Sequence, residues 1–178
     1  MDAEINFGHD AECSYLLTRA AELIADVSLI GRAQETAQML MEHVCREGLD
    51  FSDGGLYYLS DCDTGKVDRS KIWWVQAEGI TACYNCYQIT GDETYLDYAI
   101  TIWRYIKAQI VNTETGDWNT IGENSIGDGT LRVVFTNEEK AGKGKCPYHN
   151  SRACFEMIKR VNTQYPDPGK IQLENEEE

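Results

Sequence analysis

Basic residues are scarce in this 178-residue sequence, which has 16 lysines and arginines against 30 aspartates and glutamates. The formal net charge is −14. A chain this acidic is repelled by phosphate backbones and by anionic membrane surfaces. We therefore expect neither nucleic acid nor a membrane among its partners.

Long apolar segments are missing as well. No uninterrupted apolar run approaches the ~20 residues that a membrane-spanning helix requires. Met1 is not followed by the basic and then apolar residues of a secretion signal. These two absences lead us to expect a soluble, cytoplasmic protein.

The cysteines do not follow a disulfide or metal-binding pattern. There are seven, an odd number, and most fall in segments that resemble helices. This usage favours free thiols in a reducing compartment. Cys83 and Cys86 form a single CxxC pair, whereas a zinc site needs further ligands at matching spacing. We expect these two cysteines to be buried thiols, and we expect no metal site.

Hydrophobic residues make up 42% of the chain, which is enough for one core of ordinary size. We expect a single domain over residues 1–165. An acidic, disordered tail is expected over residues 166–178, which end in three consecutive glutamates.

Within the domain, apolar residues recur at steps of three and four, the period of amphipathic helices. The pattern predicts five helices, over about 10–25, 29–46, 73–89, 93–111 and from near Pro147 to about 164. The apolar stripe of the first helix is Cys13, Leu16, Leu17, Ala20, Ala21 and Ile24, and one face of the fifth carries Cys154, Met157, Ile158 and Val161. Gly91 and Asp92 are expected to end the third helix and to cap the fourth.

The connections between these helices alternate short, long, short and long. The first long connection has the residues of a hairpin, with Gly54–Leu59 and Lys66–Ile72 flanking a turn at Asp61–Gly65. The second runs to Gly144, with one strand predicted at Leu131–Phe135. An all-α, up-and-down arrangement follows, in which the first, third and fifth helices run parallel.

Chemically active side chains begin these three parallel helices and therefore meet at one end of the domain. His9 and Glu12 share one face of the first helix, Trp74 and Glu78 share one face of the third, and His149 begins the fifth. The positive end of a helix dipole disfavours an imidazolium, which leaves a neutral ring to act as a base. Two such histidines suit a reaction that removes a proton from one face of a carbon and returns one to the other. The indole of Trp74 offers a plate for a sugar ring.

Three sequence blocks around these residues resemble signature blocks of the N-acylglucosamine 2-epimerase and cellobiose 2-epimerase family. They are Phe7-Gly8-His9-Asp10-x-Glu12, Trp73-Trp74-x-Gln76-Ala77-Glu78 and Lys145-Cys146-Pro147-Tyr148-His149-Asn150-Ser151-Arg152. The resemblance runs from His9 to about Val161 and matches the last five or six of the family's twelve helices. It implies the C-terminal half of an (α/α)6 barrel, with five to six antiparallel helices.

The resemblance also implies a reaction. His9 and His149 would be the acid/base pair at C2 of a mono- or disaccharide, working through an enediolate. Glu12 and Glu78 would hydrogen-bond sugar hydroxyls and orient His9, and Trp74 would stack on the sugar. No metal or organic cofactor is implied.

Two positions depart from the family's pattern. Tyr15, which we also place in the substrate-binding site, stands where the family often has Trp. Gly144 stands where the family usually has a Trp as well. An arginine and a further histidine of the family's N-terminal half have no counterpart here. Half a barrel also exposes the apolar sides of its inner helices, so self-association or a complementary N-terminal half-barrel is the expected partner.

Two other interpretations are open. The chain is either an active epimerase or a catalytically inactive, truncated one that acts as a carbohydrate-binding or vestigial half-domain. A glycoside hydrolase would instead use Glu12 and Glu78 as paired carboxylates, although the histidine motifs around them favour the epimerase. Arg152 in the third block either supports the site or forms a salt bridge along its own helix.

Overall fold

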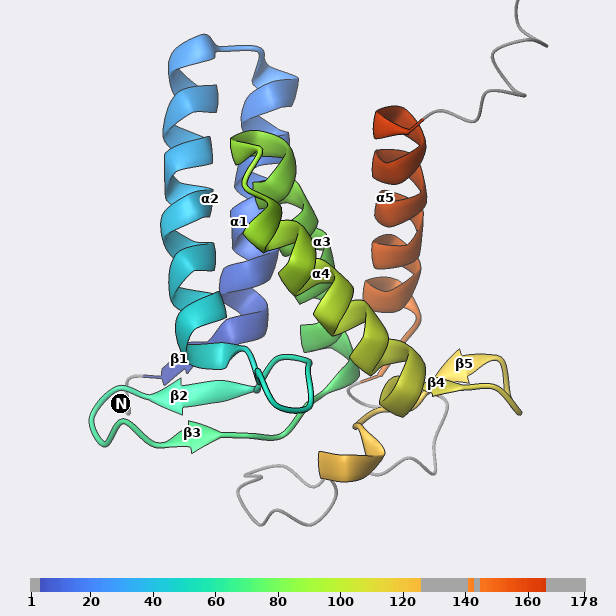
Figure 1. Ribbon diagram of the computed structural model, residues 1–178. Coiled ribbons are helices and arrows are strands. Elements are labelled where there is room, and N and C mark those ends of the chain that lie inside the picture. The colour runs from blue at the N-terminus through green and yellow to red at the C-terminus, as the bar shows by residue number, and fades with distance from the viewer. Residues whose placement is uncertain (1–3, 126–140, 143–144, 166–178) are drawn as a thin grey trace, which may run out of the picture.

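The computed structural model describes residues 4–125, 141–142 and 145–165 (Figure 1). These residues form five α-helices: α1 (Phe7–Ile24), α2 (Val27–Gly48), α3 (Trp73–Thr90), α4 (Glu93–Tyr105) and α5 (Tyr148–Gln164). The predicted all-α fold is confirmed. The predicted strand at 131–135, the glycine at 144 and the tail at 166–178 lie outside the described residues. Within the described residues, no helix combines the length and apolarity needed to cross a membrane.

The helix boundaries follow from local capping. The Asn6 side chain accepts a hydrogen bond from the His9 amide at the start of α1, and Asp92 caps α4 through the Thr94 amide. Gly91 ends α3 with a φ of 71°, the left-handed conformation that glycine adopts without strain. The predicted roles of Gly91 and Asp92 are therefore confirmed.

The fourth helix differs from its prediction. The α-helical conformation ends at Tyr105, a π-helix follows over Ile106–Ile110, and Val111–Asn112 is the strand β4. Ile106 and Ile110 are nonetheless fully buried. The apolar spacing therefore located the buried face correctly, but it could not distinguish an α-helix from the wider π-helical turn.

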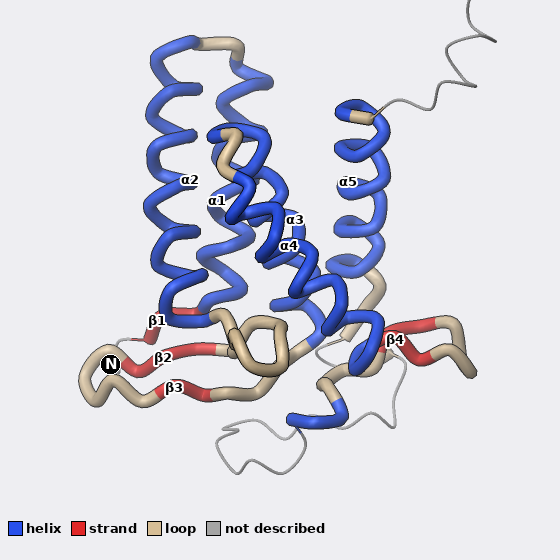
Figure 2. Tube along the Cα trace, viewed as in Figure 1, coloured by secondary structure: helices blue, strands red, loops and turns tan. Residues whose placement is uncertain are grey.

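Three helices lie in a row, with α3 packed between α1 and α5, while α2 covers α1 and α4 covers α3 (Figures 1 and 2). Helix α3 is the centre of the core, and every residue over 73–86 is buried. Its neighbours α1 and α5 each have one side that no described element covers.

Small antiparallel sheets join the helices at the end where α1, α3 and α5 begin (Figure 2). The predicted hairpin is present as β2 (Leu59–Asp61) and β3 (Val67–Asp68). A strand that the sequence did not reveal, β1 (Glu4–Asn6), pairs with β2 to give the order β1-β2-β3. A second pair is formed by β4 and β5 (Asp117–Trp118).

The apolar stripe of α1 is mostly exposed. Of its six residues, Ala21 is buried, whereas Leu16, Leu17 and Ile24 are 40%, 41% and 64% exposed. Helix α1 instead buries Phe7, Gly8, Ala11, Ser14, Tyr15, Thr18 and Ala21. Small residues allow α1 to approach α2 and α3 closely, and both faces of α1 have helical spacing, so the period alone did not identify the packed face.

The apolar face of α5 is mostly exposed as well. Met157 of this face is partly buried, but Cys154, Ile158 and Val161 are exposed. These residues form one wall of an apolar groove of about 430 Å³ whose other walls include Trp103, Ile106 and Trp118. Apolar side chains are thus exposed on both α1 and α5.

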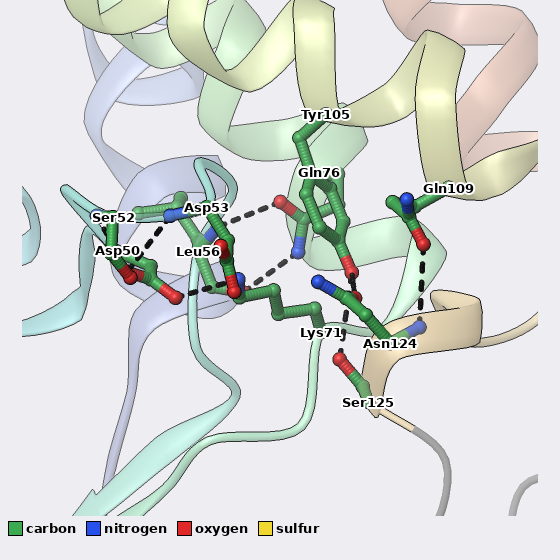
Figure 3. Close-up of polar contacts among 10 residues, drawn as sticks. All are labelled: Asp50, Ser52, Asp53, Leu56, Lys71, Gln76, Tyr105, Gln109, Asn124 and Ser125. Carbon is green, nitrogen blue, oxygen red and sulfur yellow. Dashed lines mark hydrogen bonds and ion pairs between the residues drawn. The ribbon is translucent and has the colours of Figure 1, made fainter.

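A buried ion pair fixes the loops below α3 and α4 (Figure 3). The Lys71 ammonium lies 2.7 Å from a carboxylate oxygen of Asp50 and 4.6 Å from the ring centre of Tyr105. The Tyr105 hydroxyl donates to Asn124, which belongs to a short 3-10 helix over Glu123–Ser125. Residues from four separate segments are therefore held together at the N-terminal end of α3.

Gln76 fastens the loop that contains Asp50 to the same end of α3. Its side-chain oxygen accepts from the Leu56 amide and its nitrogen donates to the Leu56 carbonyl, both at 2.7 Å (Figure 3). This paired contact satisfies the buried Leu56 amide and carbonyl, which the isolated antiparallel bridge of Leu56 with Leu49 leaves unused. The conspicuous glutamine of the second sequence block is thus explained as a structural clamp.

Candidate active site

The start of α1 is shaped to receive the indole of Trp74. A Cβ atom placed on Gly8 would lie 2.4 Å from the Trp74 ring, so the indole fits against α1 because residue 8 has no side chain. The next residue, His9, places its ring centre 4.9 Å from that of Trp74. The glycine and histidine of the first block therefore act together.

His149 reaches the same indole from α5. Its ring centre lies 5.4 Å from that of Trp74, and its ring is also in contact with Tyr148. Trp74 is 9% exposed. Two imidazoles from different helices are therefore brought to one aromatic ring, and stacking of a sugar on that ring stays a prediction.

Glu78 is the most buried charged group of the site, with a side chain that is 1% exposed. One carboxylate oxygen accepts from the Tyr15 hydroxyl at 2.6 Å, and the other lies 2.5 Å from Nδ1 of His149. Burial alone would raise the pKa of Glu78, but hydrogen bonds from His149, Tyr15 and Arg152 outweigh it and hold the pKa below its ordinary value. Glu78 is thus an ionised carboxylate that orients His149.

Arg152 connects both carboxylates of the site. Its Nη2 atom lies 2.5 Å from Glu12 and 2.7 Å from Glu78, and its guanidinium covers the ring of Tyr148 at 4.4 Å. Burial lowers the pKa of Arg152, but the bonds to Glu12 and Glu78 outweigh this and raise it. Of the two interpretations of Arg152, support of the site is the one observed. Its signal in the sequence is its position one helical turn after His149.

The six residues singled out from the sequence lie in one cluster: His9, Glu12 and Tyr15 on α1, Trp74 and Glu78 on α3, and His149 on α5. The ring of His9 makes no hydrogen bond with Glu12 or Glu78 in the described part of the chain. Orientation of His9 by these carboxylates stays a prediction, as does their contact with sugar hydroxyls.

A sequence model of the family described as N-acylglucosamine 2-epimerase matches residues 3–153, most of the chain. The chain belongs to this family. It is 36% identical over 154 residues to the cellobiose 2-epimerase of Bacteroides fragilis, covering 86% of this chain and 37% of that protein. It is 30% identical over 125 residues to the D-mannose isomerase of Marinomonas mediterranea, covering 70% of this chain and 30% of that protein.

Solved structures agree with this membership. The crystal structure of a sugar epimerase from a ruminal bacterium superimposes with a TM-score of 0.77 and 30% sequence identity, over 94% of this chain and 40% of that one. The predicted resemblance and the partial (α/α)6 barrel are confirmed. This epimerase-family chain spans about two fifths of the length of its relatives.

Glu12, Glu78 and His149 also have the composition of a metal site, with ligand atoms within 4.8 Å of one another. Arg152 already supplies a positive charge to both carboxylates of this group. A divalent cation at the same place would be repelled by the guanidinium. In this family member the cluster therefore suits an arginine better than a metal ion.

Proposed function

We propose that this chain carries the acid/base residues of a sugar 2-epimerase of the cellobiose or N-acyl-hexosamine type. His9 and His149 would abstract and return a proton at C2 of a mono- or disaccharide through an enediolate. The supporting observation is the approach of both imidazoles to Trp74 from two different helices. Proton transfer between a carbon and imidazoles requires no metal or organic cofactor.

The other residues of the cluster have supporting roles in this proposal. Glu78 orients His149, and the Tyr15 hydroxyl orients Glu78 in turn. Glu12 is 21% exposed and is therefore the carboxylate better able to meet a sugar hydroxyl. Trp74 provides the apolar surface between the two bases.

The same proposal requires a second half-barrel. Leu16 and Leu17 are exposed on α1 and Phe155 on α5, and Ile158 is exposed in the groove beside α4. Apolar patches of this kind are usually covered by another subunit. Either a second copy of this chain or a complementary N-terminal half-barrel would cover them and close the site over the sugar.

Hydrogen exchange at C2 tests the proposal. Purified protein of known oligomeric state is incubated in deuterated water with cellobiose, mannose or N-acetylmannosamine, and NMR follows the entry of deuterium at C2. Exchange that is lost in both His9→Ala and His149→Ala is expected. The best substrate would then name the sugar class.

A second candidate function is sugar binding without turnover by this half-barrel. It is favoured because these residues match 37% and 40% of the length of the relatives, which supplies only part of an (α/α)6 barrel. Saturable sugar binding, together with no deuterium at C2, would identify it. A glycoside hydrolase has less support, because its acid needs a raised pKa, whereas the pKa of Glu78 is lowered.

A further inference from the structure

Arg152 lies where the charged groups of the cluster meet. Its Nη2 atom contacts Oε1 of Glu12 and Oε1 of Glu78, and the same Glu78 oxygen faces Nδ1 of His149. The side chains of Arg152 and Glu78 are 18% and 1% exposed. Little water is available to screen these charges, so each one depends on the others.

Two neighbouring carboxylates are difficult to ionise together without a cation. Glu12 and Glu78 offer oxygens within 4.8 Å of each other, and like charges at this distance favour uptake of a proton by one member. Burial disfavours the charge of Glu78 most. Without Arg152 the proton would therefore settle on Glu78 or on its partner His149.

The protonation of Glu78 decides which ring nitrogen of His149 is free. An ionised carboxylate can only accept, so Nδ1 of His149 carries the proton and Nε2 keeps its lone pair. A protonated Glu78 would donate to Nδ1, which places the proton of the neutral ring on Nε2. If the ring itself takes up the proton, both nitrogens carry one, and Nε2 is again blocked.

We propose that Arg152 is a positioning residue that keeps Nε2 of His149 unprotonated by holding the Glu78 carboxylate ionised against Nδ1. The use of Nε2 as a base rests on the proposed function, whereas the tautomer is a property of the folded chain. In the described part of the chain, the titratable groups around the ring are His9, Glu12 and Tyr15 on α1, Glu78 on α3, and Tyr148 and Arg152 on α5. Among the described residues, Arg152 is the cation that touches both carboxylates.

Long-range 1H–15N correlation NMR of the labelled full chain reads the tautomer directly. Spectra are recorded at about pH 8.5, above the ordinary histidine pKa of about 6.5, and the His149 signals are assigned by their loss in His149→Gln. The wild type is expected to show a protonated Nδ1 and an unprotonated Nε2. Arg152→Met is expected to shift Nε2 to the protonated signal, and Arg152→Lys to retain the wild-type pattern.

Arg160→Met is the matched control. It removes the same charge from the same helix, but Arg160 bonds to Glu156, Asn85 and Gln88 at the far end of α5. The His149 signals should not change. Arg160 and Ala153 still hold α5 against α3 when Arg152 is replaced. The amide spectrum of Arg152→Met should therefore remain that of the folded chain. If it does not, the test is repeated with Arg152→Gln.

Two results would overturn the proposal. One is a wild-type His149 that carries its proton on Nε2, which needs no variant to establish. The other is an unchanged tautomer in a folded Arg152→Met or Arg152→Gln chain. If His149 shows the expected tautomers but the chain exchanges no deuterium at C2, only the proposed function is contradicted. If the chain exchanges deuterium at C2 but the tautomer does not change when Arg152 is replaced, only the role of Arg152 is contradicted.

Discussion

Single residues of the cluster divide into those that face a substrate and those that hold others in place. Both oxygens of Glu78 are engaged by Tyr15, His149 and Arg152. A buried carboxylate with all its partners inside the protein has little capacity left for a sugar hydroxyl. The structure therefore favours Glu12 over Glu78 for direct contact with the substrate.

Gly8→Ala tests the close approach of α1 to Trp74. The added Cβ would lie 2.4 Å from the indole, and something in the site must shift. We expect a loss of about 1–3 kcal/mol in the free energy of unfolding, measured by urea denaturation. Gly31→Ala is the control, because residue 31 lies inside α2 and a Cβ added there would meet no atom within 4 Å. This change should raise the free energy of unfolding by up to about 1 kcal/mol. Equal effects of the two changes would contradict the packing described.

The residues of the site were predictable because three motifs place them at the starts of parallel helices. His9, Trp74 and His149 are found together as that argument requires. Arg152 was left undecided because an arginine at this spacing pairs equally well with its own helix. Its true partners, Glu12 and Glu78, are 140 and 74 residues away in sequence, and helical spacing carries no information about such pairs.

Among structural elements, the loops before α3 depend on the ion pair of Lys71 with Asp50. Lys71→Met leaves the Asp50 charge buried without its partner, and we expect a loss of about 3–5 kcal/mol in the free energy of unfolding. Lys107→Met, at an exposed lysine, should change it by less than about 0.5 kcal/mol. Urea denaturation measures the free energy of unfolding of both variants. A Lys71 variant as stable as the Lys107 control would show that the Lys71–Asp50 pair contributes nothing to stability.

The pair of Lys71 with Asp50 also makes the stability of the fold depend on pH. Burial alone would raise the pKa of Asp50, but hydrogen bonds from Lys71 and Ser52 outweigh it and lower the pKa well below its usual range. A lowered folded-state pKa contributes stability above the unfolded value of about 3.9, and this is lost as pH falls through the folded value. The wild type should therefore lose stability below about pH 4 more steeply than Asp50→Asn/Lys71→Met. Parallel pH profiles from thermal unfolding would contradict this.

The five helices were predictable from apolar spacing, and the hairpin from its turn residues, because both signals are local. The strand β1 was not, since Glu4–Asn6 pairs with Leu59–Asp61 and this register exists only after folding. The packed faces of α1 and α5 could not be read from the apolar stripes for a related reason. Each helix has a second face that could pack, and the choice depends on which neighbours are present.

At the scale of the whole molecule, the exposed apolar sides of α1 and α5 are the main departure from an ordinary monomer surface. We expect the chain to associate with rising concentration, so that its mass by light scattering exceeds 20.1 kDa. Leu17→Ser and Phe155→Ser should weaken this association. Met39→Ser, at a residue that is 72% exposed on α2, should not. A wild type that stays at 20.1 kDa throughout would show that these faces do not self-associate.

The most direct test of the central proposal is deuterium incorporation at C2 of a sugar by the intact chain. Epimerase chemistry on His9 and His149 predicts that deuterium enters C2 with the wild type and that exchange disappears in both His9→Ala and His149→Ala. Well-folded wild-type protein that leaves C2 unlabelled with cellobiose, mannose and N-acetylmannosamine would contradict it, and would favour a sugar-binding half-domain instead.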